Sequence, residues 1–167
     1  MQPLILTALL DDVAQQRFDR LRQDNFPAGR NHLDAHLTLF HALPGDREQQ
    51  LTTAVRAAAT RPVITARVAG VRKLGRGVAY TITAPELTQL RSALARQWAD
   101  WLTAQDRVKA DLHVTVQNKV EPATAARLHS RLSAEFQPYR VAVTGLGLWR
   151  YLGGPWAPVA RFPFERV

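Results

Sequence analysis

The sequence of 167 residues contains no cysteine and a single methionine. The absence of cysteine excludes disulfide bonds, thiolate metal sites, iron–sulfur clusters and a thiol nucleophile. Long hydrophobic runs are missing too. The apolar run within Met1–Asp12 is too short to span a bilayer and has no basic residue before it, so we expect neither a membrane segment nor a signal peptide, and we expect a cytoplasmic protein. Because cysteine is absent, any catalytic chemistry must come from histidines, carboxylates, hydroxyl groups or bases.

Lysine is scarce, although the chain is basic. Lys+Arg number 22 against 14 Asp+Glu, a net charge of +8, and the lysines are only Lys73, Lys109 and Lys119. Arginine matches the geometry of phosphate better than lysine does, which favours a phosphate-bearing partner. A GC-rich coding sequence would explain the same composition. With 46% hydrophobic and 22% charged residues, the chain is typical of one compact domain over residues 1–167.

Hydrophobic periodicity predicts alternating strands and helices without a flexible linker. A strand over Leu4–Leu10 precedes a helix capped by Asp11 or Asp12, and Gly75–Gly77 and Gly153–Gly154 mark hairpin turns. The other expected strands cover residues 35–43, 63–74, 78–84, 112–120, 139–151 and 156–164, and the other helices cover residues 46–61, 85–101 and 122–136.

The two halves of the chain repeat one pattern. From His36 and again from His113 the order is strand, proline, helix, proline, strand, glycine turn, strand, with an offset of 77 residues between the histidines. Such a repeat predicts an α+β fold of two pseudo-symmetric lobes, each an antiparallel sheet with helices on the outside, enclosing a central cleft. The corresponding strands are expected to face one another across that cleft.

Each half carries the same short motif at the start of this pattern, His36–Leu39 and His113–Val116, which reads His-apolar-Thr-apolar. Because side chains alternate along a strand, His and Thr project to one face while the apolar residues point to the core. One neutral imidazole could remove a proton, a protonated one could donate a proton, and the hydroxyls of Thr38 and Thr115 could hold phosphate oxygens. The paired motifs therefore indicate metal-independent phosphodiester chemistry.

At these motifs the chain resembles the 2H phosphoesterase superfamily, and within it the bacterial 2′-5′ RNA ligase and cyclic-phosphodiesterase-like proteins. The resemblance extends over both motifs, their spacing, the repeat and the segments 148–151 and 156–158. It implies a two-lobed fold with a central cleft and a catalytic role for His36, Thr38, His113 and Thr115. It also implies 2′,3′-cyclic phosphates or 2′-5′ linkages as substrates.

Strand alternation adds three candidates for substrate binding. Phe40 would stack on a base, Gln117 would hydrogen-bond it and Lys119 would contact phosphate; the alternatives are a hydrophobic cleft wall for Phe40 and a solvated strand end for Lys119. Arg150 and Tyr151 are weaker candidates, whose alternative is ordinary surface or core packing.

A metal site is not expected, because His32, Asp34 and His36 have no second carboxylate cluster beside them in the sequence. We expect no cofactor, no membrane and no obligate protein partner. The leading interpretation is a phosphoesterase that opens 2′,3′-cyclic phosphates of nucleotides or RNA ends, with 2′-5′ ligation as a further activity. The alternative is a non-catalytic nucleotide- or RNA-binding module that uses the same cleft.

Overall fold

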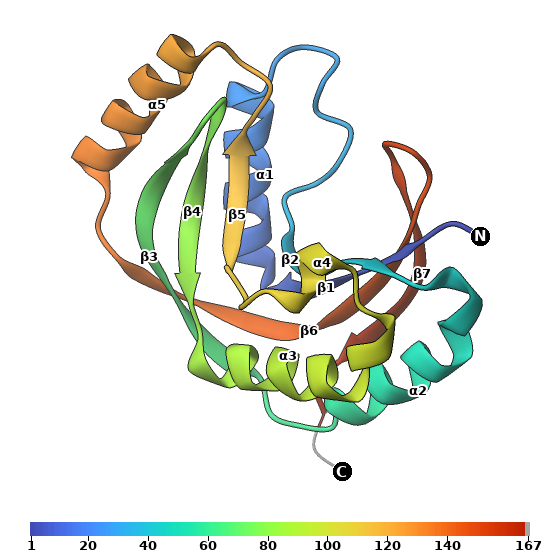
Figure 1. Cartoon of the computed structure of the whole chain (residues 1–167). Helices are drawn as coiled ribbons and strands as arrows, with labels where there is room; N and C mark the ends of the chain where they lie inside the picture. The colour runs from blue at the N-terminus through green and yellow to red at the C-terminus, as the bar shows by residue number, and fades with distance from the viewer. Residues whose placement is uncertain (166–167) are drawn as a thin grey trace.

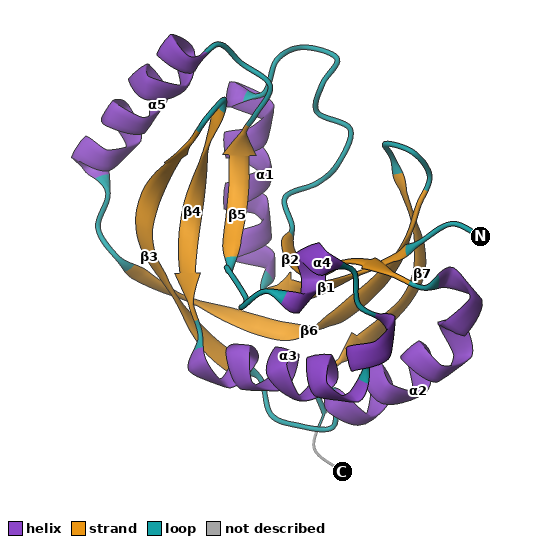
Figure 2. Cartoon of the chain, viewed as in Figure 1, coloured by secondary structure: helices purple, strands orange, loops and turns teal. Residues whose placement is uncertain are grey.

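The computed structural model describes residues 1–165 and has the alternating strands and helices that the sequence predicts (Figures 1 and 2). The short helix α4 was not expected. The strands are β1 (Leu4–Leu10), β2 (Leu37–Leu43), β3 (Ile64–Leu74), β4 (Gly77–Thr83), β5 (His113–Gln117), β6 (Tyr139–Tyr151) and β7 (Trp156–Pro163). The helices are α1 (Asp12–Asn25), α2 (Glu48–Ala58), α3 (Pro85–Gln97), α4 (Ala104–Arg107) and α5 (Pro122–Glu135), with 3-10 turns at Gly45–Arg47 and Ala99–Trp101.

The sheet closes on itself through antiparallel pairs. β1, β2, β5, β4, β3 and β6 are neighbours in that order, β6 pairs again with β1, and β7 extends from β6. The junction of β2 with β5 consists of one matched residue pair, Leu37 with Val114, whereas the other junctions have four or more. This thin junction divides the sheet into one half with β1, β2 and β7 and another with β3, β4 and β5, and β6 belongs to both.

The repeat and the α+β class are confirmed. β2, α2, β3 and β4 follow one another as β5, α5, β6 and β7 do in the second half. One expectation needs correction, because the two motif strands do not face each other across a gap. They lie side by side as neighbours in the same sheet, since β2 and β5 are joined by the pair Leu37 and Val114.

The helices exchange partners between the halves. α1 follows β1 in the chain but packs on β5 and β4, where the rings of Phe18 and Tyr80 lie 5.6 Å apart. The end of α3, which follows β4, packs on β2, where the rings of Trp98 and Phe40 lie 5.2 Å apart. α5 covers β3 and β4 (Figure 1). Within residues 1–165, no helix is both long and apolar enough to cross a membrane.

Each motif strand carries a β-bulge directly after its threonine. In β2, Thr38 pairs with Thr7 of β1 and Phe40 pairs with Leu6, so Leu39 is the extra residue. A bulge inserts one residue and reverses the alternation of side chains beyond it.

The same irregularity occurs in β5. Thr115 pairs with Ala79 of β4 and Gln117 pairs with Val78, so Val116 is the extra residue. β4 begins at Gly77, where a Cβ atom would lie 1.9 Å from the backbone oxygen of Gln117. Only glycine lets the two strands approach this closely at the bulge.

The bulges overturn the predicted positions of Phe40 and Gln117. Both were expected on the cleft face, but Phe40 is fully buried and Gln117 is 4% exposed. Phe40 packs against Trp98, with the guanidinium of Arg91 4.5 Å from its ring centre. Strand alternation fails here because the extra residue in each strand turns the next side chain into the core.

We expect Phe40→Ala to lower the free energy of unfolding by about 3–5 kcal/mol, because it leaves a cavity between Trp98 and Arg91. Denaturation with urea measures this loss, and Phe40→Leu, which keeps most of the volume, should lose clearly less. A loss below about 1 kcal/mol for Phe40→Ala would show that the ring does not belong to the core.

Candidate functional site

The pair Leu37 and Val114 determines how the two motifs meet. Continuing its antiparallel register by one residue on each side places His36 opposite Thr115 and Thr38 opposite His113. Residues that stand opposite in antiparallel strands project to the same face, and Leu37 and Val114, which are fully buried, occupy the other face. The two imidazoles and two hydroxyls therefore share one face of the sheet, each histidine beside the threonine of the other motif.

Both imidazoles are oriented by the same hydrogen bond. Nδ1 of His36 lies 2.8 Å from the backbone oxygen of Asp34, and Nδ1 of His113 lies 2.7 Å from that of Asp111. A carbonyl oxygen can only accept, so Nδ1 carries the proton in each ring and Nε2 remains free to accept or donate one. An aspartate two residues before each histidine is a repeated signal in the sequence, and it could have pointed to this arrangement.

Asp111 has a second role beside His113. Nη1 of Arg72 donates to the Asp111 carboxylate at 2.8 Å, and this hydrogen bond lowers the pKa of Asp111 below its ordinary value. The other carboxylate oxygen lies 3.9 Å from Nδ1 of His113. The contact with Arg72 therefore favours the ionised form of the carboxylate that stands next to the second imidazole.

The first imidazole lies in a less polar place. Its ring packs on Trp156 with 4.5 Å between ring centres. Burial lowers the pKa of His36 to about 4, with smaller contributions in the same direction from the charges of Arg22, His113 and His41, while the hydrogen bond to Asp34 opposes them. His36 is therefore neutral at pH 7, with a free lone pair on Nε2.

A cavity of about 380 Å³ borders His36 on the side of the β6–β7 hairpin. Trp149 and Trp156 line it together with Arg161, and the two indole rings lie 6.2 Å apart. Nε1 of Trp149 donates to Oγ1 of Thr7 at 2.9 Å, which holds that ring in place. These aromatic walls were not predicted as part of the site, because they come from two strands, β6 and β7, more than a hundred residues away from His36.

Lys119 is the substrate-binding candidate that the structure brings to the motifs. It lines a second cavity, of about 210 Å³, together with His36 and Thr115. Arg150 and Tyr151 line neither cavity. Arg150 forms an ion pair with Glu48 of α2.

The position of Tyr151 and Arg150 follows from the register of the β6–β7 hairpin. Trp149 and Tyr151 share one face, but Tyr151 lies further out and is 40% exposed. Arg150 projects to the opposite face. Arg150 therefore lies on the side of the strand away from Trp149, and its contact with substrate stays a prediction.

Two buried arginines bind backbone oxygens at the two bulges, and neither was predicted from the sequence. Arg22, 4% exposed, donates from Nη1 to the oxygen of Thr115 at 2.9 Å. Arg91, 6% exposed, donates from Nε to the oxygen of Leu39 at 3.1 Å. A bulge interrupts the ladder of the strand, and a buried carbonyl needs another donor. Each arginine therefore stabilises the bend that follows one motif.

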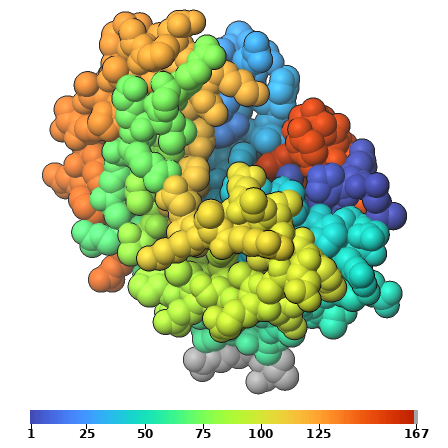
Figure 3. Space-filling model, viewed as in Figure 1, coloured from blue at the N-terminus to red at the C-terminus, as the bar shows by residue number. Residues whose placement is uncertain are grey.

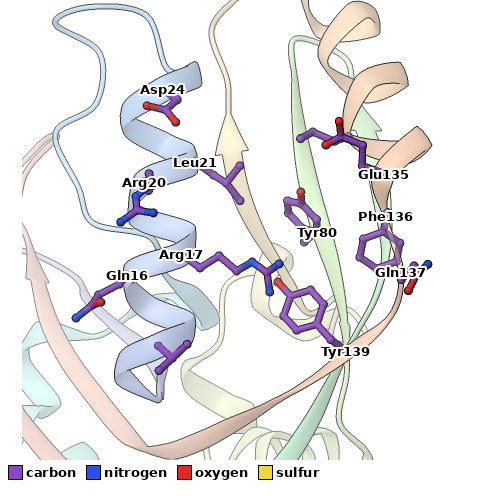
Figure 4. Close-up of a pocket in the computed structure, with 12 residues that line it drawn as sticks. Gln16, Arg17, Arg20, Leu21, Asp24, Tyr80, Glu135, Phe136, Gln137 and Tyr139 are labelled. Atoms are coloured by element: carbon purple, nitrogen blue, oxygen red, sulfur yellow. The ribbon is translucent and has the colours of Figure 1, made fainter.

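A larger cavity, of about 480 Å³, lies elsewhere, between α1 and α5 (Figure 4). Arg17 lies over the ring of Tyr139 at 4.3 Å, next to Tyr80 and Glu135. Burial raises the pKa of both tyrosines above the ordinary value, so these phenols stay neutral. This cavity has no histidine among its lining residues, and we place the candidate site at the motifs instead.

Within residues 1–165, no three His, Asp or Glu side chains come together as metal ligands.

The chain is similar to a known protein family. A model of the 2′-5′ RNA ligase superfamily matches residues 10–155. Among curated proteins, none matches the chain.

Solved structures share the fold at low sequence identity. LigT of E. coli, solved in complex with 3′-AMP, has 18% identity and a TM-score of 0.65, with 99% of each chain covered. A protein described as a phosphoesterase has 18% identity and a TM-score of 0.66, covering 99% of this chain and 100% of its own. The protein TT0787 of Thermus thermophilus has 17% identity and a TM-score of 0.61, with 98% of both chains covered.

The low pKa of His36 can be measured directly. In an NMR titration of the ring signals, we expect a midpoint near pH 4, assigned by the loss of the signal in His36→Gln. Trp156→Ala exposes the ring and should move the midpoint up toward the ordinary value of about 6.5. A midpoint near 6.5 in the unchanged protein would contradict the burial of this imidazole.

Proposed function

We propose that the protein opens 2′,3′-cyclic phosphates of nucleotides or RNA ends without a metal ion. The proposal starts from the family, because the chain belongs to the 2′-5′ RNA ligase superfamily of 2H phosphoesterases. The observation that carries the proposal is the register at Leu37 and Val114, which assembles two His/Thr pairs on one face. A water molecule is the nucleophile, and the 2′ or 3′ oxygen of the ribose is the leaving group.

His36 is the general base in this proposal. Its depressed pKa keeps it neutral, and the hydrogen bond from Nδ1 to Asp34 leaves Nε2 free to take a proton from the attacking water. The water oxygen forms a bond to phosphorus as the bond to the ribose oxygen breaks.

His113 is the general acid. As an imidazolium it has the Asp111 carboxylate 3.9 Å away as a counter-charge, and its Nε2 donates a proton to the leaving ribose oxygen. The product is a ribose phosphate monoester, and exchange with solvent restores both histidines.

Thr38 and Thr115 hold the nonbridging phosphate oxygens in the same proposal. Each hydroxyl stands opposite a histidine of the other motif, so both oxygens would be held while the charge on the phosphate changes. With a ribose 5′-hydroxyl in place of water, the same groups would join RNA ends through a 2′-5′ linkage.

The cavity beside Trp156 supports a nucleotide as substrate. Its aromatic walls and its volume of about 380 Å³ suit a base and ribose, with the base stacked on an indole ring. E. coli LigT, which shares the fold, was solved with 3′-AMP and with NADP+. A 3′-nucleotide is also one product of the proposed ring opening.

We expect His36→Ala and His113→Ala each to lower the turnover of 2′,3′-cyclic AMP by about 10²-fold or more, because each removes one proton-transfer group. The assay contains EDTA, and wild-type activity should be unaffected by it. His129→Ala on α5 is the matched control, because that ring bonds to the backbone of Val71 and lines neither cavity.

Two outcomes would overturn the proposal. One is a His113→Ala variant that keeps more than about a third of the wild-type turnover. The other is activity that EDTA abolishes and a divalent ion restores. Tight nucleotide binding without turnover in the wild type would favour the alternative, a non-catalytic nucleotide- or RNA-binding module.

A further inference from the structure

The second cavity beside His36 has walls of a different character from the first. It lies where the loop after α1, the turn after β5 and the tip of the β6–β7 hairpin meet. In Figure 3 these segments, coloured blue, orange and red, come close together in the upper part of the face shown. Its volume of about 210 Å³ is below the range of about 300–1,000 Å³ usual for a whole small ligand. It suits one group of a ligand that extends from the histidines.

The lining is basic and contains no carboxylate. Arg22, Arg30 and Lys119 line it together with His32 and His36. Asp19 and Asp34, whose charges raise the pKa of Arg22 against the effect of its burial, are not among the lining residues. The cavity therefore offers several donors to an anion.

Among the residues that the structure describes, the positive charges of Arg22, Arg30 and Lys119 have no carboxylate bonded to them. Within residues 1–165, the side chains of Arg30 and Lys119 make no hydrogen bond and no ion pair. Arg22, nearly fully buried, bonds only to neutral oxygens, those of Asn31, Leu33 and Thr115. A buried cation without a carboxylate partner is costly, and an anionic ligand would compensate that cost.

The backbone at Lys119 is a second, independent observation. Its φ is +63°, a left-handed conformation that is unfavourable for a residue with a Cβ atom and that favours glycine or asparagine. The turn is held from both sides, because the N–H of Val120 donates to the oxygen of Arg76 at 3.1 Å and Nε of Arg76 donates to the oxygen of Val120 at 3.0 Å. Residues in unfavourable backbone conformations are concentrated at ligand sites, where the surrounding structure maintains them. Here the residue in such a conformation is Lys119, which lines the cavity.

We propose that the cavity of Arg22, Arg30 and Lys119 binds a second phosphate of the substrate, separate from the phosphate that reacts between the histidines. Its position relative to the reacting group rests on the proposed function. The preferred substrates are then nucleotides that carry a further phosphate. This group is either a terminal phosphate monoester or the next phosphodiester of a strand, which present the same anionic oxygens to the arginines and the lysine.

Calorimetry with product-like ligands tests this proposal without any turnover. We expect adenosine 3′,5′-bisphosphate to bind the wild type about tenfold or more tightly than 3′-AMP, as charge-assisted hydrogen bonds to one more phosphate imply. Arg30→Gln should reduce this ratio to below about threefold. Lys119→Asn should reduce it too, and asparagine suits the left-handed backbone, so the turn keeps its shape.

The control is Arg96→Gln, which removes an exposed arginine of α3 that lines neither cavity and should leave the ratio unchanged. The dinucleotide ApAp carries a strand phosphodiester where adenosine 3′,5′-bisphosphate carries a terminal monoester, so the two ligands distinguish these groups. Tighter binding of either ligand than of 3′-AMP supports the subsite. The proposal would be overturned if both ligands bound only as tightly as 3′-AMP, or if neither Arg30→Gln nor Lys119→Asn changed the ratio of affinities. Hydrolysis of 2′,3′-cyclic AMP is measured separately, so a failure of the proposed function and a failure of the subsite give different results.

Discussion

One backbone contact determines the geometry of the site. Leu37 of β2 and Val114 of β5 form the single matched pair that joins the two halves of the sheet. Their register places each histidine beside the threonine of the other motif, and a shift of one residue would turn one set of side chains toward the core. Because both residues of the pair are fully buried, the core that they help to form also holds the functional face in place.

The rest of the structure stabilises this short junction. Each motif strand bends at a bulge, and a buried arginine, Arg22 or Arg91, donates to a backbone oxygen at the bend. The fully buried carboxylate of Asp106 accepts the backbone N–H groups of His41 and Ala42 and so holds the end of β2. Since α1 and α3 pack on the opposite halves from the strands they follow, the halves are interlocked by the helices as well as by the sheet.

The two motifs are equivalent in sequence, but the surroundings of their histidines differ, and the proposed roles of base and acid rest on this difference. His36 packs on Trp156 and its pKa is lowered by burial, whereas His113 has a carboxylate near its ring, which Arg72 keeps ionised. Similar groups whose surroundings differ are typical of acid–base pairs.

The repeat, the order of strands and helices, the hairpins and the shared face of the motif residues could be predicted from the sequence, because alternation and turn residues are local signals. The positions of Phe40 and Gln117 could not, since a bulge in an apolar run leaves no mark in the pattern. Trp156 and Arg22 were missed because they reach the motifs only through the closed sheet and the packing of α1.

The central claim is that the two histidines act as one proton-transfer unit, and a double-mutant cycle of kcat on 2′,3′-cyclic AMP tests it most directly. Groups that act as a unit are strongly non-additive, so the His36→Ala/His113→Ala double variant should be about as slow as the slower single variant. Losses that multiply in the double variant would mean that the two imidazoles act independently, and this result would contradict the claim.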